Sequence, residues 1–177
     1  KDKDFTTDEN VVTLYVPENT KFQNATLNSA LGNILLNHVC FESGTVSSGD
    51  GDIFIKNSTL KEVAVSASLG DVKTYDSKIK TCNFVLSDGD FTAKNNEFTG
   101  ETLINDDLGN IEVQGSKKQW SSLGVDASTD LGDIEVSETL EGTLKENDSD
   151  ESEYQRSGKN GKVKLHAEDG DITMKCN

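Results

Sequence analysis

The residue types that build most catalytic and nucleic-acid-binding sites are scarce in this chain. Its 177 residues include only two histidines, His38 and His166, and one arginine, Arg156. Asp and Glu together number 32 against 17 for Lys and Arg, so the net charge at pH 7 is −15. A surface with this charge repels phosphate backbones and anionic lipid headgroups. The composition therefore argues against binding of nucleic acid and against binding to a membrane surface.

Cysteine and long apolar runs are scarce as well. Cys40, Cys82 and Cys176 have no C-x-x-C spacing, which excludes the common zinc and thioredoxin motifs. We expect small apolar core residues with reduced thiols, and a disulfide between two of them is the alternative. No apolar run approaches the ~20 residues of a membrane span, and the first ten residues are too polar for a signal peptide. We therefore expect no insertion of this segment into a membrane.

Length and apolar content predict one domain with a small core. Domains usually hold about 100 to 200 residues. Leu, Ile, Val and Phe make up about 24% of the chain, just above the ~20% below which charged chains stay disordered. We assign residues 1–10 to an N-terminal tail and residues 11–177 to a single domain.

The dominant feature of the chain is a repeat in which Gly is followed by Asp or Asn. The first four pairs are each 19 residues apart, and the residue two positions after the glycine is always apolar. The residue four positions after it is apolar in most repeats, and such alternation predicts a short strand with one buried face. The repeat glycines are Gly32, Gly51, Gly70, Gly89, Gly109, Gly132 and Gly170.

A unit of this length cannot bury its few inward residues alone, so the units must stack and share one core. The repeat predicts an all-β fold, a parallel β-helix or β-solenoid, with about 19–20 residues per coil and roughly seven or eight coils stacked in chain order. We expect a right-handed wind, the usual hand of parallel crossovers. The glycines mark a corner that needs positive φ or close backbone approach, and Asn57-Ser58, Asp76-Ser77 and Asn95-Asn96 mark a second corner.

Two departures from the period mark the ends of the domain. The run Val11–Pro17 contains the only proline of the chain, which suits an edge or cap strand because proline cannot donate to a ladder. Residues 141–161 interrupt the repeat and are rich in acidic and polar side chains. We interpret this insertion as an acidic surface loop or a disordered tongue.

The chain resembles a bacterial adhesin-like family of unknown function. The resemblance lies in the opening Val12–Thr20, in the repeated Gly-Asp-Ile units, and in the closing segments Gly161–Leu165 and Glu168–Ile172. It implies a β-helix-like domain outside the cytoplasm, at the cell surface, anchored by a membrane segment that lies outside these residues. The family has no agreed catalytic residues, so the resemblance assigns none here.

Two groups of residues are candidates for a binding site. Asp52, Asp71 and Asp90 follow stacked glycines, and their carboxylates either cap turns or hold calcium. We favour turn capping, because the nine-residue calcium solenoid motif is absent. Trp120, beside Lys117 and Lys118, either stacks on a sugar or packs into the longer coil around it. For His38 and His166 we expect solvated or corner positions, since neither has a partner at a catalytic spacing.

The sequence therefore favours a non-enzymatic module at the cell surface, with a carbohydrate or an envelope protein as partner and no cofactor. A polysaccharide-active β-helix enzyme is the first alternative, but abundant acids make an accidental pair of carboxylates uninformative. A sensory or scaffolding domain of an envelope-stress system is the second alternative.

Overall fold

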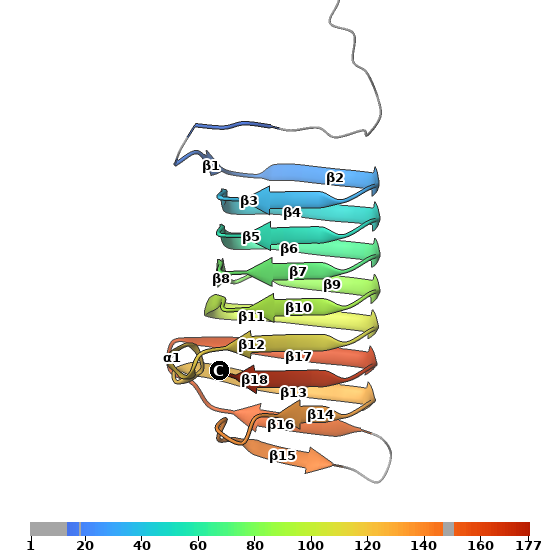
Figure 1. Cartoon of the computed structure of the whole chain (residues 1–177), viewed down its shortest axis with the longest axis vertical. Helices are drawn as coiled ribbons and strands as arrows, with labels where there is room; N and C mark the ends of the chain where they lie inside the picture. The colour runs from blue at the N-terminus through green and yellow to red at the C-terminus, as the bar shows by residue number, and fades with distance from the viewer. Residues whose placement is uncertain (1–13, 18, 147–150) are drawn as a thin grey trace, which may run out of the picture.

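The computed structural model describes residues 14–17, 19–146 and 151–177. Almost all regular structure in these residues is β-strand, and the strands form two sheets that run the length of the molecule (Figure 1). The chain passes from the larger sheet to the smaller one at each repeat glycine. The predicted parallel β-solenoid is thus confirmed.

The smaller sheet has seven strands, all paired in parallel. Each strand begins two residues after a repeat glycine, where the apolar alternation of the sequence begins. In spatial order the strands are β3 (Ile34–Asn37), β5 (Ile53–Lys56), β7 (Val72–Tyr75), β10 (Phe91–Lys94), β12 (Ile111–Gly115), β18 (Ile172–Cys176) and β14 (Ile134–Val136).

The larger sheet has eleven strands, and its longer strands end just before the repeat glycines. In spatial order these are β2 (Ala25–Leu31), β4 (Cys40–Asp50), β6 (Thr59–Leu69), β9 (Asn83–Asp88), β11 (Glu97–Leu108), β17 (Gly161–Asp169) and β13 (Leu123–Leu131). The short strands β1 (Lys21–Phe22) and β8 (Lys78–Lys80) continue the ladder beyond a bend, and β16 (Ser152–Arg156) and β15 (Thr143–Glu146) complete the sheet.

The core lies between the two sheets and consists of straight columns of inward side chains. Val72, Phe91 and Ile111 occupy one column of the smaller sheet, and each is fully buried. Phe84 of the larger sheet meets Phe91 edge to face, with 5.1 Å between the ring centres. Burial of one such side chain stabilises the fold by about 1.5–3 kcal/mol, so stacking rather than local strand preference holds the coils together.

The C-terminal strands do not follow the stacking order of the sequence. β17 pairs with β11 on one side and with β13 on the other, and β18 lies in the same way between β12 and β14. The last coil of the chain is therefore inserted between two coils that precede it (Figure 1). The expectation of stacking in chain order is wrong here. Two coils pair in parallel when their inward side chains fall into the same columns, and coils that are distant in the sequence can meet this condition.

The described part of the expected N-terminal cap strand, residues 14–17, is not a strand. Leu14 and Tyr15 are exposed, and residues 11–13 lie outside the described part of the chain. The carbonyl of Pro17 accepts a hydrogen bond from the Thr20 amide at 3.1 Å. This hydrogen bond lies just before the first paired strand, which begins at Lys21.

The acidic insertion at 141–161 contains two strands, although the sequence predicts a surface loop or a disordered tongue. β15 and β16 form an antiparallel hairpin, and β16 pairs with the outer edge of β13. Ser152 and Tyr154 of β16 are buried, and the Tyr154 hydroxyl donates to the Glu141 carbonyl at 3.2 Å. Residues 147–150 lie outside the description. The hairpin covers an edge that would otherwise expose a row of unpaired backbone groups.

Candidate functional site

The Gly corners form one straight edge of the solenoid. All seven repeat glycines have positive φ, from 110° at Gly32 to 158° at Gly109. The Gly51 amide donates to the Leu69 carbonyl at 2.9 Å, and the Gly70 amide donates to the Asp88 carbonyl at 2.9 Å. Backbone hydrogen bonds therefore continue through the corner, and successive corners stack at the spacing of the strands.

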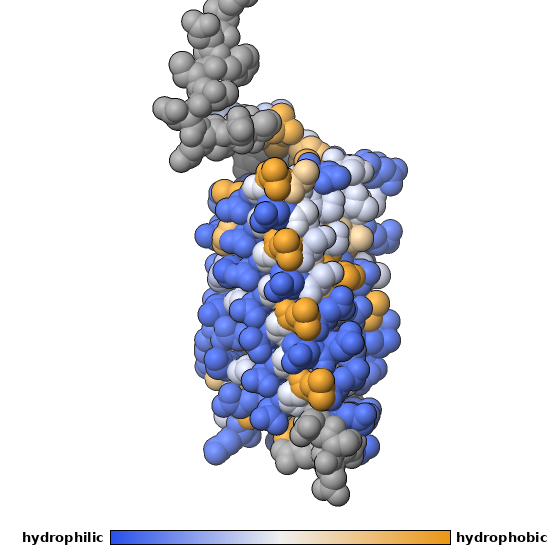
Figure 2. Space-filling model, turned by 90° about the vertical axis from the view of Figure 1, so that its right-hand side faces the viewer, coloured by the Kyte–Doolittle hydropathy of each residue, from blue (hydrophilic) through white to orange (hydrophobic). Residues whose placement is uncertain are grey.

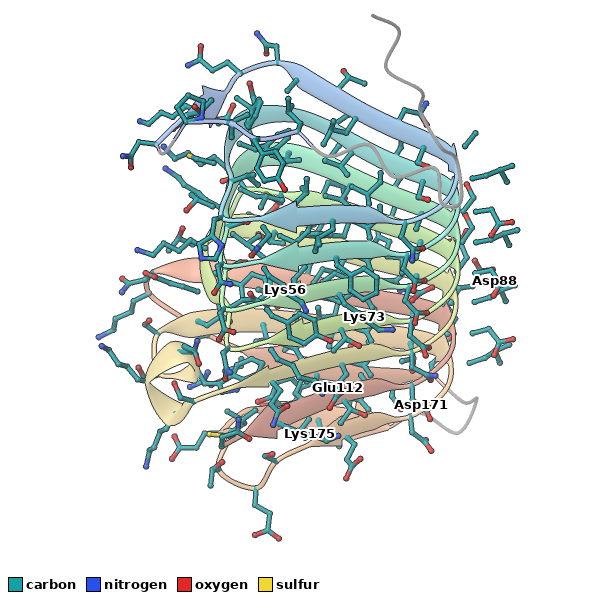
Figure 3. All side chains as sticks on the ribbon, turned by 45° about the horizontal axis from the view of Figure 1, so that its top comes forward. Lys56, Lys73, Asp88, Glu112, Asp171 and Lys175 are labelled. Carbon is teal, nitrogen blue, oxygen red and sulfur yellow. The ribbon has the colours of Figure 1, made fainter. Side chains whose placement is uncertain are left out.

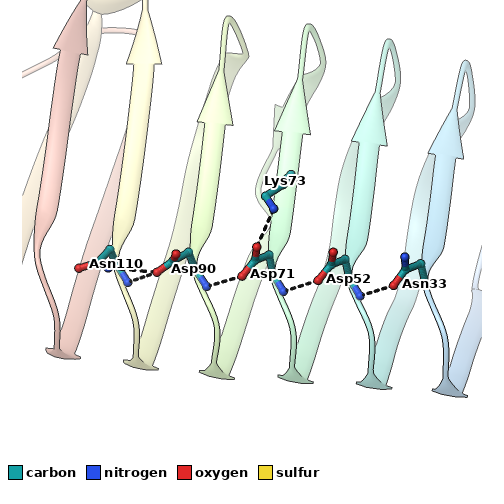
Figure 4. Close-up of polar contacts among 6 residues, drawn as sticks. All are labelled: Asn33, Asp52, Asp71, Lys73, Asp90 and Asn110. Carbon is teal, nitrogen blue, oxygen red and sulfur yellow. Dashed lines mark hydrogen bonds and ion pairs between the residues drawn. The ribbon is translucent and has the colours of Figure 1, made fainter.

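The residue after each glycine forms a second, side-chain ladder along this edge (Figure 4). The Asn33 side-chain oxygen accepts from the Asp52 amide at 2.8 Å, and the Asp52 carboxylate accepts from the Asp71 amide at 2.9 Å. The same bond joins Asp71 to Asp90 at 2.9 Å and Asp90 to Asn110 at 2.8 Å. We call this row the Asx ladder; it continues through Asp171 and Asp133.

The Asx ladder shows how the calcium candidates are used. Asp52, Asp71 and Asp90 each give one carboxylate oxygen to the amide of the next corner, and Lys73 Nζ lies 2.6 Å from the other oxygen of Asp71. Burial raises the pKa of Asp71, but hydrogen bonds from Lys73 and from the Asp90 amide outweigh it and hold the pKa below its ordinary value. No three His, Cys, Asp or Glu residues in the described ranges cluster as metal ligands.

The second corner is built without glycine. His38, Asn57, Asp76 and Asn95 have positive φ values between 48° and 57°, a region that Asn and Asp tolerate better than most residues. The following residues form a buried ladder, in which Ser77 Oγ accepts from the Ser58 amide at 3.1 Å. In the same ladder, Asn96 Oδ1 accepts from the Ser77 amide at 2.9 Å. This ladder is enclosed, and its residues are unsuited to contact a partner.

The residue before each glycine forms the most unusual surface of the molecule. In spatial order, exposed leucines and aspartates alternate down the Gly edge without a break. Figure 2 shows this edge, with apolar and polar side chains taking turns along one line. We call it the Leu-Asp ladder; it consists of Leu31, Asp50, Leu69, Asp88, Leu108, Asp169 and Leu131.

The alternation continues beyond Leu108 only because of the inserted C-terminal coil. In the sequence, Leu108 and Leu131 are the ladder residues of two consecutive repeats. β17 enters between their strands and places Asp169 between them. The four leucines are 52% to 80% exposed, although most large apolar side chains of the described residues are in the core. Burial therefore does not explain why leucine occupies these positions.

The columns that border the Leu-Asp ladder contain several carboxylates. The Asx ladder borders it on the side of the smaller sheet. The column on the other side is neutral in its first four coils, from Ala30 to Ser87, and acidic in the last three, at Asp107, Glu168 and Asp130. No Lys or Arg occupies these three columns. Carboxylates here are repelled by their neighbours, and a cationic partner would relieve that repulsion.

The outer face of the smaller sheet differs, because its cations already have partners within the protein (Figure 3). Lys175 Nζ lies 2.9 Å from Glu112, and hydrogen bonding to Lys175 holds the pKa of Glu112 low. Lys56 Nζ lies 5.4 Å from the centre of the Tyr75 ring. The lysines on this face are Lys56, Lys73, Lys94 and Lys175.

Trp120 does not form a sugar platform. It ends the short helix α1 (Lys117–Trp120), is 3% exposed, and its indole N–H donates to the Lys175 carbonyl at 3.0 Å. The Arg156 guanidinium donates to the Trp120 carbonyl and to the Leu123 carbonyl. The ring fills the space that the longer coil creates, and neither of its faces is open to a ligand.

The remaining reactive side chains are isolated or enclosed. His166 Nδ1 lies 3.1 Å from Ser128 Oγ, and His38 occupies an exposed corner. Cys40, Cys82 and Cys176 are all free thiols, and burial raises the pKa of Cys82 to about 11. A thiol with that pKa is a poor nucleophile at neutral pH.

Sequence reasoning located the Gly corners but missed the Leu-Asp ladder. The signal was present in the triplets Leu31-Gly32-Asn33 and Asp50-Gly51-Asp52, whose first residues differ in a regular way. The alternation of Leu and Asp was hidden because Leu108 is followed, in the next repeat of the sequence, by another leucine, Leu131. Only the stacking order of the coils shows that Asp169 lies between them.

The comparisons with known proteins agree with this architecture. The model of the Toastrack DUF4097 family matches residues 4–175. The chain belongs to the Toastrack family. It is a domain family of unknown function, so membership assigns the β-solenoid-like fold and no activity. Searches among curated proteins and among solved structures gave no match. No helix of the described residues is long and apolar enough to cross a membrane.

Proposed function

We propose that this Toastrack domain is a non-enzymatic, extracytoplasmic binding module that holds an extended partner along the Leu-Asp ladder. The observation that carries the proposal is the row of exposed leucines and aspartates at coil spacing. The leucines are separated by aspartates, so they form no continuous apolar patch, but their regular repetition along one edge gives an extended partner several equivalent apolar contacts. The location at the cell surface is part of the same proposal and rests on the adhesin-like resemblance of the sequence.

The rigid edge favours tight binding of a long partner. Ladder residues lie at strand ends whose amides and carbonyls are hydrogen bonded to neighbouring corners, as at Gly51 and Gly70. A surface that is already ordered loses little conformational entropy when a partner binds. A protein partner from the cell envelope fits better than a glycan, because Leu-Asp ladder positions hold no aromatic ring on which sugars could stack.

The described residues favour binding over catalysis. The two groups with the largest upward pKa shifts are Asp106 and Cys82, and both side chains are buried in the core. Perturbed groups at an active site normally face a cleft that substrate can enter. The Gly edge instead offers a repeated pattern of equivalent positions, which suits recognition of a repeated or extended ligand.

Site-specific photo-crosslinking in cells tests the proposal. A photoreactive residue in place of Leu69 should give a discrete protein adduct. One in place of Leu35 should not, because Leu35 is even more exposed than Leu69 but lies on the smaller sheet. The adduct at position 69 should disappear when Asp88→Asn is added. A glycan and cell-wall array, probed with calcium and with chelator, is the second arm. Binding to the array that persists after the substitution at position 69 and after Asp88→Asn would contradict the proposal.

A further inference from the structure

Each step of the Leu-Asp ladder pairs a short apolar surface with a carboxylate. Leu69 and Leu108 are 52% and 53% exposed, and Asp88 lies between them in the register of β6, β9 and β11. Lys and Arg side chains have the complementary construction, since an aliphatic stem ends in a cationic group. One cationic side chain can therefore pack its stem on a leucine while its charge reaches the neighbouring aspartate.

The spacing of the ladder selects the conformation of the partner. Adjacent strands lie about 4.8 Å apart, so equivalent ladder positions repeat every two coils, about 9.6 Å. A polyproline II helix has three residues per turn and rises about 3.1 Å per residue, so it presents one side chain per ~9.3 Å on the same face. A β-strand repeats every ~6.8 Å and an α-helix every ~5.4 Å. Only the polyproline II repeat matches the two-coil step.

Backbone chemistry points to the same conformation. The Gly32, Gly51 and Gly70 amides donate to carbonyls of the neighbouring corner residues, so this edge offers no free row of strand partners. A polyproline II segment needs none, because its own backbone groups are solvated. The ladder must therefore recognise its partner through side chains.

We propose that the Leu-Asp ladder binds an extended basic segment of a partner protein in the polyproline II conformation, with Lys or Arg at every third residue. The proposal rests on the binding function argued above and specifies its ligand. A second copy of this chain is the less suitable occupant, since its net charge of −15 would bring further carboxylates against the ladder.

The test uses the full chain and labelled peptides that span the ladder. A repeating Lys-Pro-Pro peptide should bind in a fluorescence anisotropy titration, and binding should weaken with added salt. A peptide of repeating Lys-Pro-Pro-Pro with the same number of lysines should bind at least about tenfold more weakly, a difference of about 1.4 kcal/mol, because its lysines lose register.

Ladder variants should separate register from simple charge attraction. The double variant Leu69→Ala/Leu108→Ala and the single variant Asp88→Asn should each reduce the affinity for the Lys-Pro-Pro peptide about tenfold. Leu35→Ala and Asp76→Asn are the matched controls, because Leu35 is exposed outside the ladder and Asp76 lies on the opposite corner. Thermal unfolding of every variant confirms that the chain is folded.

Four results would overturn the inference. Equal binding of the two peptides would show unspecific charge attraction. Absence of peptide binding, with ladder-dependent crosslinking in cells retained, would refute the polyproline II ligand and leave the proposed function standing. Self-association that depends on concentration and is lost in the Leu69→Ala/Leu108→Ala variant would identify a second copy as the occupant. If the chain shows neither crosslinking at position 69 nor binding of the Lys-Pro-Pro peptide, both the proposed function and its ligand are refuted.

Discussion

Gly70 lies against the backbone of Gly51 so closely that a Cβ atom on Gly70 would be 2.7 Å from the Gly51 carbonyl oxygen. Gly70 also has φ of 132°, which side chains rarely adopt. Gly32, at the first corner, has φ of 110°, but a Cβ atom there would find only Ser29 Oγ, at 3.9 Å. The two positions share the strained backbone and differ in the neighbour that a side chain would meet.

Substitution of these glycines should therefore have unequal effects. Gly32→Ala should lower the free energy of unfolding by about 1 kcal/mol, the cost of the backbone conformation alone. Gly70→Ala should lower it by about 2–4 kcal/mol, because the corners must also move apart. Urea denaturation of the two variants measures the difference. Equal losses would mean that close stacking of the corners contributes nothing.

The Asx ladder predicts that Asn can replace Asp at a corner but Ala cannot. Asp71→Asn keeps the side-chain oxygen that accepts from the Asp90 amide, as Asn33 and Asn110 do in their own corners. It loses the ion pair with Lys73, which is partly exposed, so the change should stay within about 1 kcal/mol. Asp71→Ala removes the acceptor and should cost about 1 kcal/mol more. Indistinguishable denaturation midpoints for the two variants would refute this role.

Asp106 should make the stability of the domain depend on pH. It lies in an inward column between Leu86 and Ala167, is 1% exposed, and neither carboxylate oxygen has a hydrogen-bond partner. Burial, followed by the charges of Asp90 and Asp107, raises its pKa from 3.8 to about 7. The folded state thus holds a proton that the unfolded state releases between these values.

The sign of the effect follows from this proton. The free energy of unfolding should fall as pH rises from about 4 to about 7, by at most about 4 kcal/mol, and Asp106 should add no further change at higher pH. Asp106→Asn should remove this contribution and stabilise the domain at pH 8. Asp107→Asn, an exposed neighbour, is the control and should leave most of the slope. Identical pH profiles for wild type and Asp106→Asn would show that the carboxyl is not buried as a neutral acid.

The sequence predicted the solenoid and its corners because both depend on local patterns. The triplet Gly70-Asp71-Val72 contains both the turn residues and the first inward residue of the next strand. Its structure can therefore be predicted from residues that are adjacent in the sequence. The burial of Tyr154 was not readable, because acidic neighbours dominate the composition of its segment. The ladder was hidden for a different reason: Asp169 joins it only through pairing of β17 with strands distant in sequence.

The inserted coil predicts that truncation at the two ends has different consequences. Removal of residues 1–38 takes away β1, β2 and β3, which pair only with β4 and β5. The coil of β4 and β5 becomes the new end, and the pairing among all later coils is unchanged. Removal of residues 161–177 takes away β17 and β18, the strands that connect β11 and β12 to β13 and β14.

The first truncation should leave a cooperatively folding domain of lower stability, because solenoid stability is a sum over coils and their interfaces. The second should leave β13 and β14 without their parallel neighbours, and limited proteolysis should then cleave between β12 and β13. A synthetic peptide of residues 161–177, added to the truncated chain, should restore protection, since it supplies both missing strands. Equal protease resistance of the two truncated chains would contradict the stacking order described here, and with it the unbroken alternation of the Leu-Asp ladder.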